Sequence, residues 1–324
     1  MVAAAFAGCA GNNANTNDTH MSTPAGGTTP MTMTPATTTT PTTPTSMGPT
    51  PPNCPKPAAG TGATSNQTSL TFTVTEPTAT NPCYTINGPK SAPSGWLNVT
   101  FQNGGHEPHQ IAFMALGNKT FDEFWTALRA PPGAGGMGMH EEDEPTPFGG
   151  PQAGPGGSTT AMLNLPAGDY VVVCFVPGMN GLPHAMSGMV APFHVGNATS
   201  TLAEPAADLT IDLKDYNFTW SATPTKGNHT VRVNNLGPHH HEAVLVKLTG
   251  DKKAQDFIAA FDENATGPPP LAVLSGIAPM DVHQHGYFTV DLTPGNWALI
   301  CFESDSDESP PHFVVGMIQD FTIA

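Results

Sequence analysis

Positive charge is scarce in this sequence. Among its 324 residues, 10 are Lys or Arg and 26 are Asp or Glu, so the formal net charge is −16 although only 11% of the residues are charged. The few basic residues form no run anywhere in the chain. Proteins that bind nucleic acid need clustered cations, because these displace the counterions of the polyanion. We therefore expect no nucleic-acid partner.

Long apolar runs are lacking as well. No stretch of about 18 apolar residues occurs, which is the least that a membrane-spanning helix needs. The five cysteines are an odd number, and this indicates mixed roles rather than a simple disulfide framework. With 34 Gly and 35 Pro, the chain is instead rich in turn formers, which favours an all-β body with long loops and an additional unfolded segment.

Residues 1–66 are predicted to form a tether rather than a domain. The start, MVAAAFAGCAGNN, resembles the lipobox of prokaryotic lipoproteins, whose cysteine is lipidated, but it lacks the usual basic residues in front. An uncleaved N-terminus is the alternative. The Thr/Pro-rich residues that follow, as in TPATTTTPTTPTSMGPTPP, cannot bury enough surface to offset their ordering entropy. We expect a disordered tether, a lipid anchor at Cys9, and an extracytoplasmic protein that is anchored to the membrane or secreted.

The rest of the chain contains one pattern twice. WLNVTFQNGGHEPHQIAFMAL and HTVRVNNLGPHHHEAVLVKL each predict a strand, a turn with Gly and His, and a second strand, and His109 aligns with His241. Each copy continues with one short amphipathic helix, KTFDEFWTALRA from Lys119 and KKAQDFIAAFDE from Lys252.

The match becomes closer further along. LPAGDYVVVCF lies against LTPGNWALICF without a gap, and each predicts a turn followed by a strand that ends in Cys-Phe. The loops after the two cysteines also finish alike, in LPHAMSGM and PPHFVVGM. We therefore predict two domains after the tether, residues 67–198 and residues 199–324.

These repeated residues suit a redox metal. A copper ion that exchanges single electrons needs ligands that both oxidation states accept, and two imidazoles, a thiolate and a weak axial thioether meet this need. One imidazole has to come from elsewhere in the fold, because a single loop cannot surround the metal. Both copies supply the set in the same order: His109, Cys174, His184 and Met189 in the first, and His241, Cys301, His312 and Met317 in the second.

Each copy resembles a cupredoxin, the Greek-key β-sandwich of blue copper proteins. The first loop is similar to the ligand loop of two-domain copper nitrite reductases, which also carries Cys, Pro-Gly-Met, Pro, His and Gly-Met. Nine residues separate Cys174 from His184 and ten separate Cys301 from His312, more than in most small electron-transfer cupredoxins. The resemblance implies an all-β fold of two tandem sandwiches and one type 1 copper in each domain.

Other residues compete for these roles. A cysteine at a strand end often only packs in the core. Neighbouring histidines and methionines are alternative ligands or simple turn and core residues: His106, His239, His240, Met179 and Met186.

The residues beside the cysteines bear on catalysis. In copper nitrite reductases and multicopper oxidases, a histidine on the catalytic copper adjoins the type 1 cysteine, whereas here Val173 precedes Cys174 and Ile300 precedes Cys301. We therefore expect no enzyme but a one-electron carrier, confined by its anchor near redox proteins at the cell surface or membrane. The alternative is a copper storage or delivery protein, because MSTPAGGTTPMTM and GGMGMHEEDE offer thioethers and His140 to soft Cu(I).

Cys54 and Cys83 fall outside the repeated pattern. In an extracytoplasmic protein we expect them to form a disulfide that pins the end of the tether to the first domain. Two free thiols are the alternative.

Overall fold

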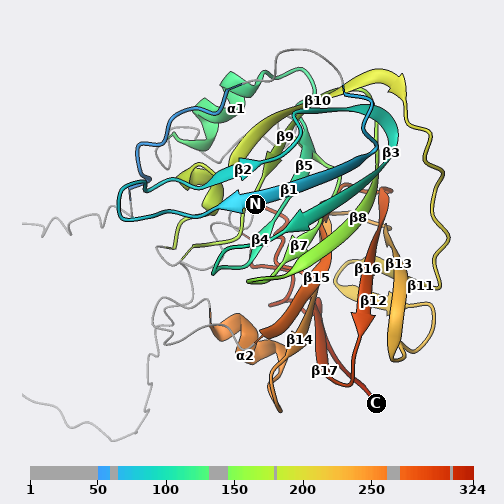
Figure 1. The fold of residues 1–324 in the computed structure, drawn as a ribbon. Helices are drawn as coiled ribbons and strands as arrows, with labels where there is room; N and C mark the ends of the chain where they lie inside the picture. The colour runs from blue at the N-terminus through green and yellow to red at the C-terminus, as the bar shows by residue number, and fades with distance from the viewer. Residues whose placement is uncertain (1–49, 59–64, 131–144, 179–180, 261–270, 307–308) are drawn as a thin grey trace, which may run out of the picture.

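The computed structural model describes residues 50–58, 65–130, 145–178, 181–260, 271–306 and 309–324. Within these ranges most regular structure is β-strand, accompanied by the α-helices α1 (Phe121–Leu128) and α2 (Ala254–Ala259) (Figure 1). The prediction of an all-β fold with one short helix in each half is confirmed. Residues 1–49 of the predicted tether, with Cys9, lie outside the described residues, as does His140, whereas its residues 50–58 are described.

The first half is a sandwich of two layers. The strands of the first layer, in spatial order, are β2 (Thr85–Asn87), β1 (Ser69–Thr75), β3 (Ser91–Gln102) and β8 (Ser158–Leu165). Those of the second are β6 (Thr146–Pro147), β5 (Ala112–Ala115), β9 (Gly168–Val173) and β10 (Val190–Thr199). Phe72 of β1 lies between the layers, with its ring centroid 5.8 Å from that of Phe113 in β5 and 6.2 Å from that of Phe193 in β10. Strand β3 shows why the sequence forms this sandwich, because Leu97, Val99 and Phe101 alternate with less buried residues and point into the core.

The second half has the same two kinds of layer. One contains β12 (Asn217–Trp220), β11 (Leu209–Lys214), β13 (Gly227–Asn235) and β16 (His285–Leu292). The other contains β15 (Leu271–Met280), β14 (His241–Leu248), β17 (Gly295–Ile300) and β18 (Ile318–Ile323). The ring centroids of Trp220 and Phe321 lie 5.7 Å apart across the two layers. Trp297 is fully buried between the layers.

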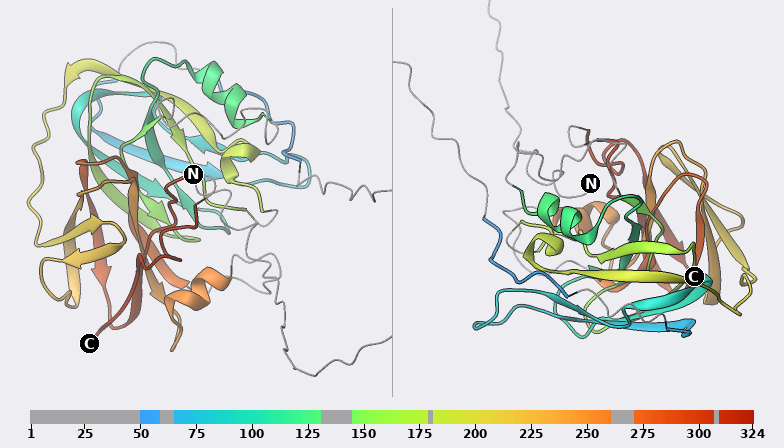
Figure 2. Two further views of the ribbon diagram at one scale, coloured as in Figure 1. Left: turned by 180° about the vertical axis from the view of Figure 1, so that it is seen from behind. Right: turned by 90° about the horizontal axis from the view of Figure 1, so that it is seen from above.

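Backbone pairing joins the two halves. Strand β8 pairs with β16 at Met162 and Tyr287, so one sheet runs through both halves (Figures 1 and 2). A second contact is a pair of bridges, Phe148 with Met280 and Pro151 with Ile277, which lies next to the short ladder of β4 (His109–Gln110) and β7 (Gln152–Ala153). One hydrophobic cluster contains core residues from both halves. Strand β10 ends at Thr199, close to the predicted boundary between residues 198 and 199, and the domain boundaries stay predictions.

The segment in front of β1 is fixed to the first half. Cys54 and Cys83 form a disulfide, which confirms the predicted pairing. Arg129 of the segment after α1 donates a hydrogen bond to the carbonyl of Pro52 at 2.6 Å, and Lys56 pairs with Asp122 of α1 at 2.8 Å. Neither described helix combines the length and the apolar character that a membrane span requires.

Candidate metal centres

Two groups of buried metal-ligating atoms occur among the described residues. In the first, Nδ1 of His109 lies 2.9 Å from Nδ1 of His184, and Sγ of Cys174 lies 4.0 Å and 3.5 Å from them. In the second, Nδ1 of His241 and Nδ1 of His312 are 3.0 Å apart, and Sγ of Cys301 is 3.9 Å and 3.5 Å away. Ligands held at about 2.0 Å (N) and 2.3 Å (S) from one ion, as around zinc, lie about 3 to 4 Å apart. Both groups therefore match the spacing of ligands around a single metal ion.

The β-sandwich places each cysteine. Strand β9 is buried on both faces, and its alternate residues Tyr170 and Val172 point into the core between the layers. Cys174, two residues after Val172, belongs to the same core cluster, so its thiol also points inward. Cys301 follows β17 in the same way, in one cluster with Trp297 and Leu299.

The loops after the cysteines close by the same hydrogen bonds. The N–H of Cys174 donates to the carbonyl of Met189 at 3.1 Å, and the N–H of Met189 donates to the carbonyl of His184 at 2.9 Å. Cys301, Met317 and His312 form the corresponding bonds at 3.1 and 2.8 Å. Met189 and Met317 are fully buried and share the core cluster of their cysteines. Their role as axial ligands stays a prediction.

Carboxylates hold the outer edges of the imidazoles. Nε2 of His241 lies 2.7 Å from Oδ1 of Asp215, and Nε2 of His312 lies 2.8 Å from Oδ1 of Asp305. Burial alone would raise the pKa of both aspartates, but the hydrogen bonds to these histidines and to neighbouring groups lower it overall. An ionised carboxylate only accepts hydrogen bonds, so Nε2 of each histidine carries the proton.

This arrangement fixes the tautomer of both histidines in the second site. Burial lowers the pKa of His241 to about 4 and also lowers that of His312, so both rings are neutral at pH 7. With the proton on Nε2, each Nδ1 presents a bare lone pair, and the two lone pairs face each other at 3.0 Å. Two lone pairs at this distance repel each other unless a cation lies between them, and a metal ion supplies that cation.

The first site has the same design with one difference. Oε1 of Glu76 lies 3.0 Å from Nε2 of His109, and Glu76 directly follows β1 as Asp215 directly follows β11. Nε2 of His184 lies 3.3 Å from Oε2 of Glu107 but forms no hydrogen bond. Burial lowers the pKa of His109, but hydrogen bonds to Cys174 and Glu76 raise it overall. A metal ion would therefore displace a more firmly held proton from His109 than from His241.

A tyrosine covers the loop histidine in each site. The ring of Tyr84 lies 4.4 Å from that of His184, and its hydroxyl donates a hydrogen bond to Glu107. The ring of Tyr216 lies 5.0 Å from that of His312, and its hydroxyl donates to Oδ2 of Asp305 at 2.5 Å. Each tyrosine directly precedes the second strand of the first hairpin in its half. Both loop histidines are almost fully buried as a result.

A buried asparagine fixes the turn in front of the first histidine. The side-chain N–H groups of Asn103 donate to the carbonyls of Glu107 and Ala153, at 2.8 and 2.9 Å. Asn235 donates to the carbonyls of His239 and Met280, both at 2.9 Å.

Sequence reasoning missed the asparagines, the tyrosines and the carboxylates. The spacing held a signal for some of them, because Asn103 and Tyr84 precede His109 by the same intervals as Asn235 and Tyr216 precede His241. The carboxylates have no such signal, since Glu76 and Asp215 precede their histidines by different intervals and Glu107 and Asp305 come from different loops.

The competing residues do not join the ligand groups. His239 lies 2.8 Å from Asp215, and His240 lies 3.0 Å from Asp281. His106 contributes its backbone N–H to Glu76, and the side chain of Met186 packs in a core cluster other than that of Cys174. Met179 lies outside the described residues.

Burial also sets the state of the second thiol and its neighbour. Burial raises the pKa of Cys301 well above its ordinary value, so a metal has to displace a proton from this sulfur. Burial, followed by the nearby Glu303, raises the pKa of Glu242 to about 8. The backbone N–H of Glu242 lies 3.5 Å from Sγ of Cys301, and the N–H of Gln110 lies 3.4 Å from Sγ of Cys174. Each sulfur thus accepts one N–H from the residue after the first histidine.

Solved structures that share a likeness with the chain include copper proteins. An auracyanin from the photosynthetic bacterium Roseiflexus castenholzii is 19% identical, and the match covers 36% of this chain and 94% of that chain at a TM-score of 0.23. A blue copper oxidase from Nitrosomonas europaea is 16% identical over 79% of this chain and 84% of that chain, at 0.20. A copper-containing nitrite reductase from Thermus scotoductus is 10% identical over 79% and 60%, at 0.21. No protein-family model and no curated protein matches the chain.

The fold and the ligand groups together define a cupredoxin-like copper-binding protein. Its two His–Cys–His groups fit type 1 copper sites, as the repeated residues of the sequence predicted.

One expectation has to be corrected. The absence of a histidine beside Cys174 and Cys301 led us to expect no enzyme, but the structural neighbours include multicopper oxidases and a nitrite reductase. The lack of a histidine beside each cysteine is a local feature, and it does not exclude catalysis for the whole chain. The exclusion of enzyme activity was therefore wrong.

Proposed function

We propose that this chain is an extracytoplasmic type 1 copper protein that carries single electrons between redox partners, with one copper in each half. The observation that carries the proposal is the facing pair of Nδ1 atoms in each site, 2.9 and 3.0 Å apart, with a cysteine sulfur 3.5 to 4.0 Å from them. His109, Cys174 and His184 would hold one ion, and His241, Cys301 and His312 the other. Copper held by these ligands would cycle between Cu(I) and Cu(II), and the buried thioethers of Met189 and Met317 would supply a further weak ligand to each site.

The scaffold supports electron transfer rather than simple retention of the metal. The ligand residues are at most 1% exposed and belong to a packed sandwich. Carboxylates and backbone N–H groups orient them before any metal binds. A site that moves little between the two oxidation states spends little energy on reorganisation when an electron arrives.

The surface beside the second site suits a protein partner. Three large apolar side chains are exposed among the described residues: Leu236, Val314 and Val315. Each lies within five residues of a ligand, since Leu236 precedes His241 and the two valines follow His312. Apolar side chains around a buried redox site would let a redox protein dock closely. A lipid anchor at Cys9 would keep the protein near partners at the membrane or cell surface.

The test is copper content and visible absorption of the full chain and of its Cys174→Ser and Cys301→Ser variants. We expect two coppers per chain and an intense thiolate-to-copper band, partly lost in each variant, with a reversible one-electron couple for each site. Copper without this band would contradict type 1 sites. A band without a reversible couple would contradict electron transfer and favour storage or delivery of copper.

A further inference from the structure

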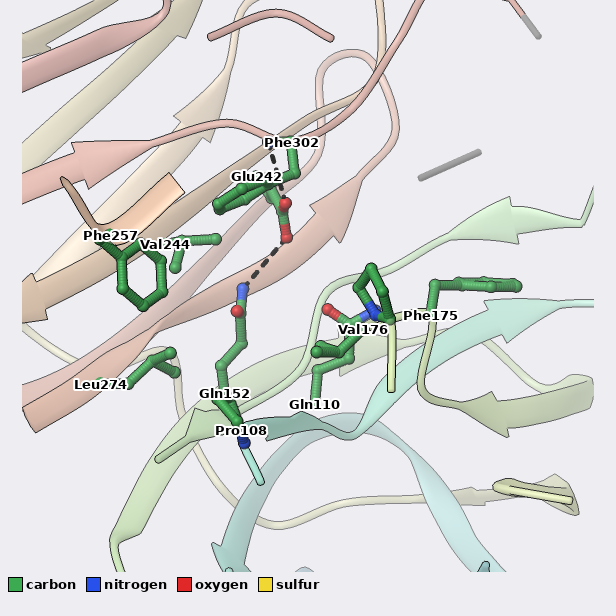
Figure 3. Close-up of a pocket in the computed structure, with 11 residues that line it drawn as sticks. Pro108, Gln110, Gln152, Phe175, Val176, Glu242, Val244, Phe257, Leu274 and Phe302 are labelled. Carbon is green, nitrogen blue, oxygen red and sulfur yellow. Dashed lines mark hydrogen bonds between the residues drawn. The ribbon is translucent and has the colours of Figure 1, made fainter. Parts of the chain in front are cut away.

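One pocket between the halves is lined by residues that are next to the ligands of both sites. Figure 3 shows this pocket, which is lined by residues that follow the ligands in both sites. Gln110 and Glu242 each follow the first histidine of a site, and Phe175 and Phe302 each follow a cysteine. The pocket therefore lies where the segments that carry the ligands of the two sites approach each other.

Buried polar residues from both halves lie along this boundary. Gln110, whose N–H lies 3.4 Å from Sγ of Cys174, lies directly across from Gln152 in the ladder of β4 and β7. The side-chain N–H of Gln152 donates to Oε2 of Glu242 at 3.2 Å (Figure 3). Gln152 and Glu242 are far apart in the sequence, and their contact joins the first half to the second.

Glu242 completes the connection to the second sulfur. Its backbone N–H lies 3.5 Å from Sγ of Cys301. Its other carboxyl oxygen, Oε1, accepts a hydrogen bond at 3.1 Å from the N–H of Phe302, the residue bonded to Cys301. Glu242 is thus linked to Cys301 both through its backbone and through its side chain.

The burial of these three polar side chains is unusual. Gln110 and Gln152 are 3% exposed and Glu242 is 2% exposed. Buried polar side chains are costly to place in a core, and a purely apolar contact would join two domains as well. Apolar residues surround the polar chain on both sides, including Phe175, Leu274 and Phe302.

We propose that Gln110, Gln152 and Glu242 form the route by which an electron passes between the two copper sites, a proposal that rests on the function proposed above. With copper bound in both sites, one electron would leave Cu(I) in one half, which would become Cu(II), and would reduce Cu(II) in the other half to Cu(I). No bond is made or broken and no proton has to move. The coupling would be carried by the N–H groups at the two sulfurs, by the ladder of β4 and β7 and by the Gln152–Glu242 hydrogen bond, because tunnelling through bonds and hydrogen bonds decays less steeply than tunnelling through gaps.

The test uses the Gln152→Met variant of the full copper-loaded chain. Methionine keeps the length of the side chain and removes the hydrogen bond to Glu242. Leu274→Ala is the matched control, since Leu274 lines the same pocket outside the polar chain. Glu242→Gln is the conservative variant, because its amide preserves a hydrogen bond with Gln152 after a side-chain flip and leaves the N–H to Cys301 in place.

The measurement is the redistribution of a single electron after a substoichiometric pulse of radiolytic reductant. The Cys174→Ser and Cys301→Ser variants supply the absorption and electron paramagnetic resonance spectra that assign each signal to a site. We expect a first-order phase, independent of protein concentration, in the unmodified chain and in the Leu274→Ala and Glu242→Gln variants. In Gln152→Met this phase should slow about tenfold or more, since the protein sets the coupling between fixed redox groups.

The spectra and the midpoint potentials of the two sites show whether a change in rate comes from the route or from an altered copper site. An unchanged rate in Gln152→Met, with both sites spectrally intact, would overturn the proposed route, as would the absence of any intramolecular phase in the unmodified chain. A loss of the thiolate-to-copper bands from the unmodified chain would instead contradict the proposed function itself.

Discussion

Oδ1 of Asp215 accepts a hydrogen bond from Nε2 of His241 at 2.7 Å. Asp215 directly follows β11, while His241 begins β14, so the bond ties the two layers of the second half together at the metal site. The carboxylate holds the proton on Nε2 and leaves Nδ1 free to bind a metal.

The Asp215→Asn variant should weaken copper binding at the second site. The amide oxygen still accepts from Nε2, but the negative charge that makes the imidazole a stronger ligand is lost. We expect copper affinity there to fall about 10- to 100-fold, the usual effect of removing such a partner. Competition with a copper chelator measures the change, and the first site of the same chain is the internal control. Equal losses at both sites would show a general loss of folding instead.

Tyr216 should slow the escape of copper from the second site. Its ring covers His312 and its hydroxyl binds Asp305 at 2.5 Å. We expect Tyr216→Ala to release copper to a chelator several times faster, because water then reaches the histidine. Tyr216→Phe, which keeps the ring, should release copper at nearly the original rate. If the phenylalanine variant were as fast as the alanine variant, the hydroxyl rather than the ring would be the barrier.

The candidate ligands could be recognised in the sequence because they repeat, and the structure brings two histidines and a cysteine together in each half. Strand, cysteine, histidine and methionine recur in the same order, and the backbone geometry of a strand end admits few arrangements of them. Helix α1 was also predictable, since Thr120 and Glu123 form a capping box at its start.

The surroundings of the ligands were not predictable in the same way. Glu76 and Asp215 approach their histidines from strands that are far away in the sequence, and only the packing of the layers brings them close. The contact of Gln152 with Glu242 depends on how the two halves join. A single sequence contains no signal for that joining, because each half is predicted from its own pattern.

The disulfide should stabilise the first metal site as well as the fold. Cys54 and Cys83 lie against the ligand loop, since the N–H of Tyr84, next to Cys83, donates to the carbonyl of Ser187 at 2.9 Å. We expect the Cys54→Ser, Cys83→Ser double variant to lose about 2 to 4 kcal/mol in the free energy of unfolding, as for other loops of this size. Denaturant unfolding of the metal-free protein measures the loss. A smaller loss would indicate that residues 50–58 contribute little to the folded state.

The pair of His229 and Asp208 gives the stability a pH dependence away from the metal sites. Their side chains are hydrogen-bonded, and the N–H of Thr230 also donates to Asp208 at 2.8 Å. Burial lowers the pKa of His229, but the bond to Asp208 raises it overall. Burial likewise raises the pKa of Asp208, but the bonds to His229 and Thr230 lower it overall.

The sign of each shift defines the pH window in which the pair stabilises the fold. A raised histidine pKa adds stability below the unfolded value of about 6.5, and this is lost as the pH rises through the folded pKa. A lowered aspartate pKa adds stability above the unfolded value of about 3.9, and this is lost as the pH falls through the folded pKa. The pair therefore contributes most at about pH 4 to 6.5.

A double-mutant cycle of His229→Gln and Asp208→Asn isolates this contribution. Asp208 is 53% exposed, so solvent screening should limit the coupling to about 1 kcal/mol or less. We expect the coupling free energy, measured by denaturant unfolding of the metal-free protein, to be larger at pH 5 than at pH 8. A coupling that stays constant between these pH values would mean that the contact acts as a neutral hydrogen bond and not as an ion pair.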